Sequence, residues 1–146
     1  MSGIIVGVDG SGHSQRALEW AAREAALRQA PLTVLTVHQA IAGYAGGAVD
    51  YPGDNAATEH AREAAQTETD KVLEAIGDQR PANVTVRAVN GLPAEELIRA
   101  SADADIVVLA SRGIGGFARL LMGSVSDQVT HHAKCPVVII PADNRQ

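Results

Sequence analysis

The sequence predicts an α/β fold, in which a doubly wound, mainly parallel sheet carries helices on both faces and so forms three layers. Two observations carry this prediction. Short apolar runs alternate along the chain with longer segments of helical periodicity. The apolar runs are rich in Val, Ile and Leu on consecutive positions, as in strands buried on both faces. The 146 residues suffice for one domain with a sizeable core, so we expect a single domain over residues 1–146.

The first unit is a strand, a turn and a helix. Residues 4–8 form an apolar run that is closed by Asp9-Gly10-Ser11-Gly12, which is typical of a buried strand followed by a turn. A helix is predicted over residues 13–28, with Pro31 beyond its end. Its apolar positions recur at the spacing of one helix face and are Leu18, Ala21, Ala22 and Ala25. Residues 32–37 form the second predicted strand.

Residues 39–56 have no periodicity and contain Gly43, Gly46, Gly47, Pro52 and Gly53. This segment is longer than the usual connection of about 4–6 residues. Two interpretations stay open: a surface loop, and a lid over a binding site.

A second helix is predicted over residues 57–76, and Gly77 suits its C-terminal cap. Its apolar stripe consists of Ala61, Ala65, Val72 and Ile76. A third strand contains Val84, Val86 and Val89. Pro93 then fits the first position of a third helix, and acidic residues follow it in the first turn.

The last part of the chain repeats the alternation. Residues 105–110 are predicted as the fourth strand, 124–133 as the fourth helix and 137–140 as the fifth strand. The sequence thus predicts five strands and four helices in alternation, as a doubly wound sheet requires.

Composition excludes several classes of function. A formal net charge of −5 argues against non-specific nucleic-acid binding, which needs an electropositive face. No apolar run approaches the roughly 20 residues of a membrane span, and the N-terminus lacks the pattern of a signal peptide. Cys135 is the only cysteine, so no intramolecular disulfide forms and the cytoplasm is the expected compartment.

The connection between the fourth strand and the fourth helix carries the strongest indication of a ligand. It holds four glycines within eleven positions: Gly113, Gly115, Gly116 and Gly123. Glycine lets a backbone approach a ligand closely, and amide groups beside a helix N-terminus bind phosphate. Ser124 and Asp127 have the spacing of a capping box, and Arg112 adds positive charge, whereas Arg119 is expected to be solvated. The alternative is that the glycines only turn the chain and Ser124 only caps the helix.

Asp9 is the second candidate, because it directly follows a strand at the edge where doubly wound sheets bind ligands. Its carboxylate suits a ribose, or a metal held through water; the alternative is a turn-forming residue before a helix.

Several familiar sites are not indicated. The sequence has no P-loop motif, and the segment after the first strand lacks the third glycine of the dinucleotide fingerprint. His131, His132 and Cys135 fall at the end of a predicted helix, where histidine suits the helix dipole. We therefore predict no metal site and no catalytic residue.

Taken together, three segments resemble the universal stress protein family. They are Ile5-Val6-Gly7-Val8-Asp9-Gly10-Ser11, Gly91-Leu92-Pro93-Ala94-Glu95-Glu96-Leu97-Ile98, and the stretch from Ala110-Ser111-Arg112-Gly113 through Gly123-Ser124-Val125 to Cys135-Pro136-Val137-Val138-Ile139-Ile140. The resemblance covers nearly all of residues 3–141, apart from 40–56. It implies a five-stranded parallel sheet of order 3-2-1-4-5, the adenine nucleotide alpha hydrolase-like fold.

The resemblance also implies a nucleotide site, because one branch of the family binds ATP where the first and fourth strands meet. Its motif is Gly, two residues, Gly, nine residues, Gly, then Ser or Thr. Gly113, Gly123 and Ser124 match the last three positions. The implied adenosine contacts are Gly7, Asp9 and Val37. The residues expected around the phosphates are Ala110, Ser111, Arg112, Gly113, Gly115, Gly116, Gly123, Ser124 and Val125.

Ala110 stands where the motif has its first glycine. Its methyl group is expected to crowd the nucleotide and weaken binding, and Ala110→Gly is then expected to tighten it.

The function implied is an ATP-binding regulatory or stress-response module, with slow hydrolysis at most and with Mg²⁺ or Mn²⁺ on the phosphates. The alternative is a dimeric interaction module with a vestigial site. The family also implies a homodimer through the fifth strand. The residues of that strand, Val137, Val138, Ile139 and Ile140, are apolar, and exposed apolar edges tend to be paired.

Overall fold

The centre of the molecule is a five-stranded parallel sheet of order β3-β2-β1-β4-β5, as the resemblance implied. The computed structural model describes residues 3–39, 52–112 and 123–141, with side chains from 56 onward in the second helix. The strands are β1 (Ile4–Val8), β2 (Leu32–His38), β3 (Val84–Asn90), β4 (Ile106–Ala110) and β5 (Val137–Ile140).

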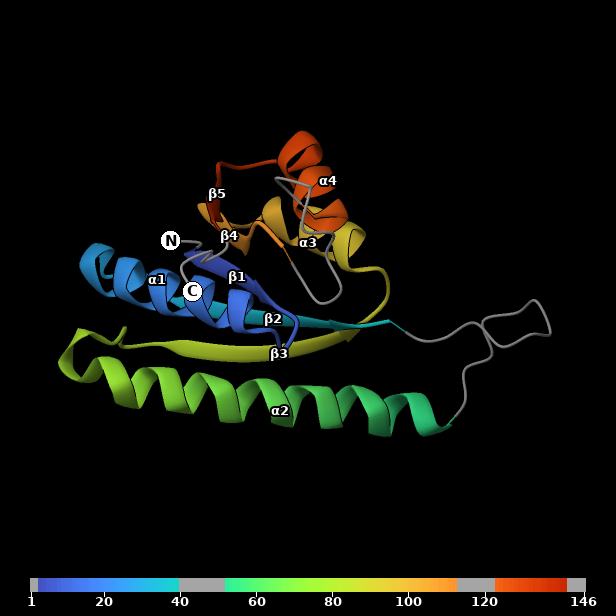
Figure 1. Cartoon of the computed structure of the whole chain (residues 1–146), viewed down its shortest axis with the longest axis horizontal. Coiled ribbons are helices and arrows are strands. Elements are labelled where there is room, and N and C mark those ends of the chain that lie inside the picture. The colour runs from blue at the N-terminus through green and yellow to red at the C-terminus, as the bar shows by residue number, and fades with distance from the viewer. Residues whose placement is uncertain (1–2, 40–51, 113–122, 142–146) are drawn as a thin grey trace, which may run out of the picture.

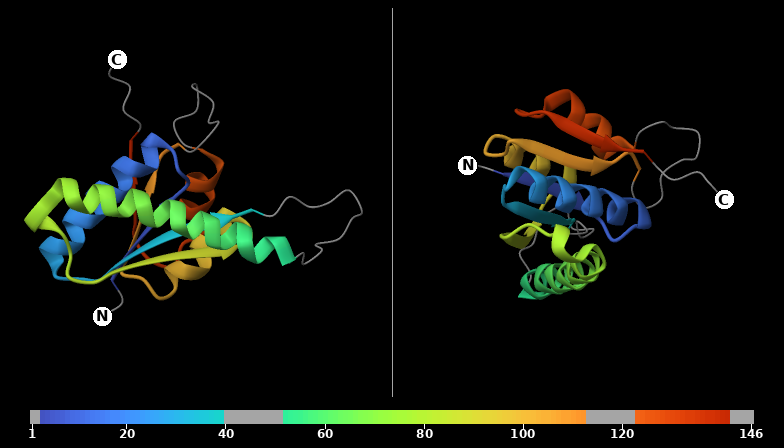
Figure 2. Two further views of the ribbon diagram at one scale, coloured as in Figure 1. Left: turned by 90° about the horizontal axis from the view of Figure 1, so that it is seen from below. Right: turned by 90° about the vertical axis from the view of Figure 1, so that its left-hand side faces the viewer.

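Helices cover both faces of the sheet and complete the three predicted layers (Figures 1 and 2). They are α1 (Gly12–Arg28), α2 (Pro52–Ile76), α3 (Pro93–Ser101) and α4 (Ser124–His132), with a short 3-10 turn over Gly77–Gln79 after α2. The first two pack on one face of the sheet, and the last two pack on the other face.

Two apolar clusters fill the spaces between these layers. The α1/α2-side cluster contains the predicted α1 stripe, in which Leu18, Ala21, Ala22 and Ala25 are all fully buried. The α3/α4-side cluster joins Ile5 and Leu109 of the sheet to Leu97 and Val129 of the helices. Residues of β1 alternate between the two clusters, so the strand is buried along its whole length, as its apolar run predicts.

The boundary of α2 differs from the prediction, because the helix begins at Pro52 rather than at residue 57. Proline fits the first turn of a helix, where its missing N–H is not needed. Pro52 and Gly53, which are typical of loops, begin this helix, so the last part of the predicted 39–56 loop is helical. Residues 40–51, where the lid interpretation falls, lie outside the described residues.

Gly3 lies at the amino edge of the sheet. Hydrogen bonds there connect the start of β1 to the residues that precede β4 and β2. Its N–H donates to Asp105 Oδ2 at 2.8 Å, and its carbonyl accepts from Asp105 N at 2.8 Å. The next residue, Ile4, donates its N–H to Pro31 O at 2.9 Å. Gly3 has φ +93°, and a Cβ at this position would lie 2.4 Å from Pro31 O.

We predict that Gly3→Ala lowers the free energy of unfolding by about 2–4 kcal/mol, because it adds a backbone clash to a φ that L residues avoid. Denaturant unfolding measures this change. The matched control is Gly12→Ala, since no atom lies within 4 Å of a Cβ built there; it should leave stability within about 0.5 kcal/mol or raise it. Equal stability of the two variants would contradict the analysis.

Candidate functional site

The described residues of the predicted site lie toward the carboxyl edge of the sheet, where β1 pairs with β2 on one side and β4 on the other. The chain leaves β1 toward α1 and leaves β4 toward α4, which pack on opposite faces of the sheet. The strand order reverses at this point, which is where doubly wound folds bind ligands. Asp9 follows β1, Ala110 ends β4, and Gly123 precedes α4.

The turn after β1 is held by hydrogen bonds within a few residues. Ser11 N donates to Asp9 Oδ1 at 2.9 Å, and Gly10 has φ +85°. Ser14, which is 3% exposed, accepts from Asp9 N at 3.2 Å through its hydroxyl and donates to Ser11 O at 3.1 Å. The exposed residue Asp9 thus stands on a turn of fixed shape.

The end of β4 and the start of α4 meet through Ser111. Its carbonyl accepts from Gly123 N at 2.5 Å and from the hydroxyl of Ser126 at 2.9 Å. Its N–H donates to Ile140 O at 2.9 Å, which continues the pairing with the last strand. These bonds bring the first and last described residues of the glycine-rich connection together.

The predicted capping role of Ser124 is wrong. Gly123 is the N-cap residue of α4, and Ser124 is the first residue of the helix. A glycine cap has no side chain to accept from the first-turn amides. The N-cap of α1 differs, since Ser11 Oγ accepts from Ser14 N at 3.1 Å. The start of α4 therefore presents amides of Ser124 and Val125 that its cap residue does not satisfy.

Gly7 has a packing reason to be glycine. A Cβ built there would lie 2.7 Å from Leu109 Cδ2 and 3.1 Å from Leu97 Cδ2, so a side chain would collide with the α3/α4-side cluster. Sequence reasoning assigned Gly7 only to the ligand. The nearby Val37 is half-buried against the same cluster and is paired with Val89.

The methyl group of Ala110 packs against the α1/α2-side cluster. The two residues on either side of it, Leu109 and Ser111, are both buried. The methyl of this half-buried residue thus lies on the α1/α2 side of the sheet, and the expectation that it crowds a nucleotide stays a prediction.

Of the remaining predicted residues, only some lie in the part of the chain that the structure describes. Arg112 is half-buried just after β4. Gly113, Gly115, Gly116 and Arg119 lie outside the described residues. Sequence reasoning missed Ser14 and Ser126, which are both 3% exposed. Each of them is the third residue of the helix that follows its loop, and this position is the signal that could have identified them.

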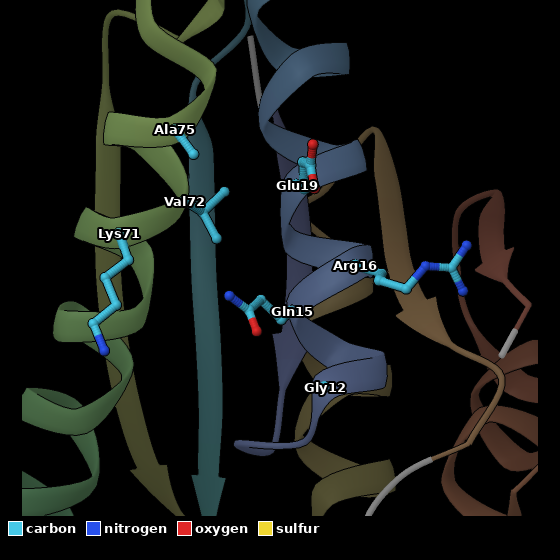
Figure 3. Close-up of a pocket in the computed structure, with 7 residues that line it drawn as sticks. All are labelled: Gly12, Gln15, Arg16, Glu19, Lys71, Val72 and Ala75. Carbon is cyan, nitrogen blue, oxygen red and sulfur yellow. The ribbon is translucent and has the colours of Figure 1, made fainter. Parts of the chain in front are cut away.

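Neither lysine of the chain lies at this edge. Lys134 follows the C-terminal end of α4, and Lys71 comes from the C-terminal half of α2. Lys71 and Gln15 line a hollow of about 170 Å³ between α1 and α2, and Figure 3 shows their side chains on opposite sides of it. Arg16 points away from Lys71 (Figure 3) and donates to Pro141 O at 2.6 Å. None of the described residues of the predicted site lines this hollow, although Gly12, the first residue of α1, does.

His131 and His132 lie in the last turn of α4, as predicted. His131 Nδ1 is 3.5 Å from Asp127 Oδ1, and both of these side chains are exposed. Within residues 3–39, 52–112 and 123–141, no three His, Cys, Asp or Glu side chains are grouped to hold a metal. In the same part of the chain, no helix is both long and apolar enough to cross a membrane.

Burial raises the pKa of the Cys135 thiol; a hydrogen bond from the Val107 backbone opposes this, and the charge of Asp105 adds to it. We predict that the rate of thiol alkylation rises with pH around a midpoint above that of a cysteine peptide, because the thiolate is the reactive form. The raised pKa stabilises the fold below the unfolded-state pKa, and this contribution falls as pH rises through the folded-state pKa. The control is alkylation of the protein unfolded in denaturant. If the midpoint of the native protein lies at or below the midpoint of the unfolded protein, the burial argument is contradicted.

Comparison with known proteins identifies the family. The sequence model of the universal stress protein family matches residues 1–141. A universal stress protein from Mycolicibacterium smegmatis is 34% identical over 144 residues, which are 98% of this chain and 49% of that protein. The chain thus spans about half the length of the curated relatives it matches.

Solved structures give the same result. Universal stress protein UspA from Lactobacillus plantarum has a TM-score of 0.72 at 26% identity, covering 95% of this chain and 97% of that one. A universal stress protein in complex with cAMP has a TM-score of 0.66 at 26% identity, covering 94% of each chain. With its sheet order and these matches, the chain belongs to the universal stress protein family.

Proposed function

We propose that this chain binds an adenine nucleotide, with ATP as the expected ligand, at the edge where β1 and β4 end. The observation that carries the proposal is the start of α4. Its cap residue, Gly123, has no side chain that could accept from the first-turn amides, and its N–H donates to Ser111 O at the end of β4. Helix N-termini of this kind favour phosphate through their amides and their dipole. The relative solved with cAMP supports an adenine nucleotide as the ligand class.

Each side of the site has a distinct role in this proposal. Asp9 and Val37, together with the backbone at Gly7, hold the adenosine end. In this proposal, Arg112 and the amides of Ser124 and Val125 bind the phosphates, together with the backbone at Ala110 and Ser111 and with the glycine-rich connection. The carboxylate of Asp9 is exposed and is already oriented by Ser11 N, which suits hydrogen bonds from ribose hydroxyls.

The same geometry favours a regulatory module over a fast enzyme. Phosphoryl transfer needs cations on the phosphates and an oriented nucleophile. Both lysines lie away from this edge, so Mg²⁺ or Mn²⁺ has to supply the charge, and hydrolysis is at most slow. The output is then a nucleotide-dependent change of conformation or partner in the stress response. The lone cysteine fits action in the cytoplasm.

A homodimer through β5 is the second part of the proposal. This strand is at the edge of the sheet, and all four of its residues are half-buried. Antiparallel pairing of two such strands would cover both edges. If nucleotide binding fails, a dimeric interaction module with a vestigial site is the remaining candidate.

Titration calorimetry with ATP, ADP, AMP and cAMP, with and without Mg²⁺, tests the nucleotide proposal. We expect saturable ATP binding to the wild-type protein. Gly123→Val should lose that binding while the thermal transition remains, because a branched side chain is placed against the helix start. Unchanged affinity in this variant would show that phosphate binds elsewhere, and turnover of several ATP per second would contradict the regulatory interpretation.

The variant Ala110→Gly tests whether the Ala110 methyl group points toward the nucleotide or toward the core. Because that methyl packs against the α1/α2-side cluster, we predict no gain in ATP affinity and a loss of about 0.5–1 kcal/mol in unfolding free energy. Calorimetry and denaturant unfolding on one preparation measure both quantities. Tighter ATP binding would restore the expectation that the methyl crowds the ligand.

A further inference from the structure

We propose that the buried hydroxyl of Ser126 is a positioning group, which holds the end of β4 against the start of α4 in the arrangement that receives phosphate. This inference rests on the nucleotide-binding function proposed above. In this inference Ser126 does not contact the ligand, and it acts through the backbone at Ser111 and Gly123.

The geometry places one hydroxyl between two segments that are distant in the sequence. Ser126 Oγ lies 2.9 Å from Ser111 O and 3.1 Å from Gly123 O. A serine hydroxyl has one proton, so it donates to either carbonyl or shares the proton between them. Ser126 is 3% exposed, so water does not compete for these bonds.

These bonds fix the orientation of two peptide groups relative to each other. Ser111 O also accepts from Gly123 N, and Gly123 O also accepts from Asp127 N at 3.0 Å, which is the first hydrogen bond of α4. The peptide that joins Ser111 to Arg112 is planar, so fixing its carbonyl also fixes its N–H. Strand end, helix cap and first helical turn therefore become one rigid unit.

The hydroxyl is not needed to satisfy the two carbonyls. Without it, Ser111 O keeps the Gly123 donor and Gly123 O keeps the Asp127 donor. Removing the hydroxyl thus leaves neither acceptor unpaired, and the large penalty for an unsatisfied buried group does not arise. The remaining effect of the hydroxyl is to restrict the relative motion of the two segments, which lowers the cost of ordering them around a ligand.

Two other buried serines provide matched comparisons. Ser14 restrains the turn at Asp9, on the adenosine side of the proposed site. Ser101 is 1% exposed, donates to Ile98 O at 2.6 Å and accepts from Lys134 N at 2.8 Å. It lies at the C-terminal end of α3, away from the site.

The test is calorimetry with ATP and with adenosine on the wild-type protein and on Ser126→Ala, Ser14→Ala and Ser101→Ala, with a thermal melt of each. Ser126→Ala should weaken ATP binding roughly five- to tenfold and leave adenosine binding unchanged. Ser14→Ala should weaken both ligands by the same factor, and Ser101→Ala neither. Ser126→Thr, which keeps the hydroxyl, should retain the wild-type ratio of the two affinities.

A ratio of ATP to adenosine affinity that Ser126→Ala leaves unchanged would overturn the inference while the proposed function stands. Loss of the cooperative melt in Ser126→Ala would also overturn it, because the hydroxyl would then serve the fold. Absence of ATP binding by the wild-type protein would overturn the proposed function, and this inference with it.

Discussion

The parallel pairing of β1 with both β2 and β4 is the constraint on which the rest of the structure depends. Because β1 lies between two partners and under helices on both sides, its residues are all buried. Its side chains must then be apolar, or absent where neighbours are close, as at Gly7. The same pairing brings the turn after β1 beside the end of β4, so the site is a consequence of the sheet order.

Two loops meet at that edge, and each is restrained by its own backbone and by a buried serine. Asp9 stands on a turn shaped by Ser11 and Ser14, while Ser111 is joined to the start of α4 by Gly123 and Ser126. Hydrogen bonds protected from water hold a loop more firmly than exposed ones. For the proposed site, such restraint at the loop ends would lower the entropy that binding has to overcome.

The two helix starts at this edge have different chemistry. Ser11 caps α1 with its hydroxyl, whereas the cap residue of α4, Gly123, has no side chain that could accept from the first-turn amides. In the proposed function, phosphate oxygens accept from these amides. Both lysines lie elsewhere, so the proposed function has backbone amides and Arg112 hold the anion and gives lysine no part in it.

The sequence by itself determined the layers, the number of strands and most element limits, because consecutive apolar residues and helical stripes report burial directly. It also placed Asp9 and the glycine-rich connection at the ends of strands. It misplaced the start of α2, where Pro52 and Gly53 resemble a loop, and it assigned the cap of α4 to Ser124 rather than Gly123. Only the tertiary structure decided which way the Ala110 methyl points, why position 7 has no side chain, and that Ser126 joins two distant segments. These properties depend on contacts between residues far apart in the chain, and local sequence patterns carry no record of such contacts.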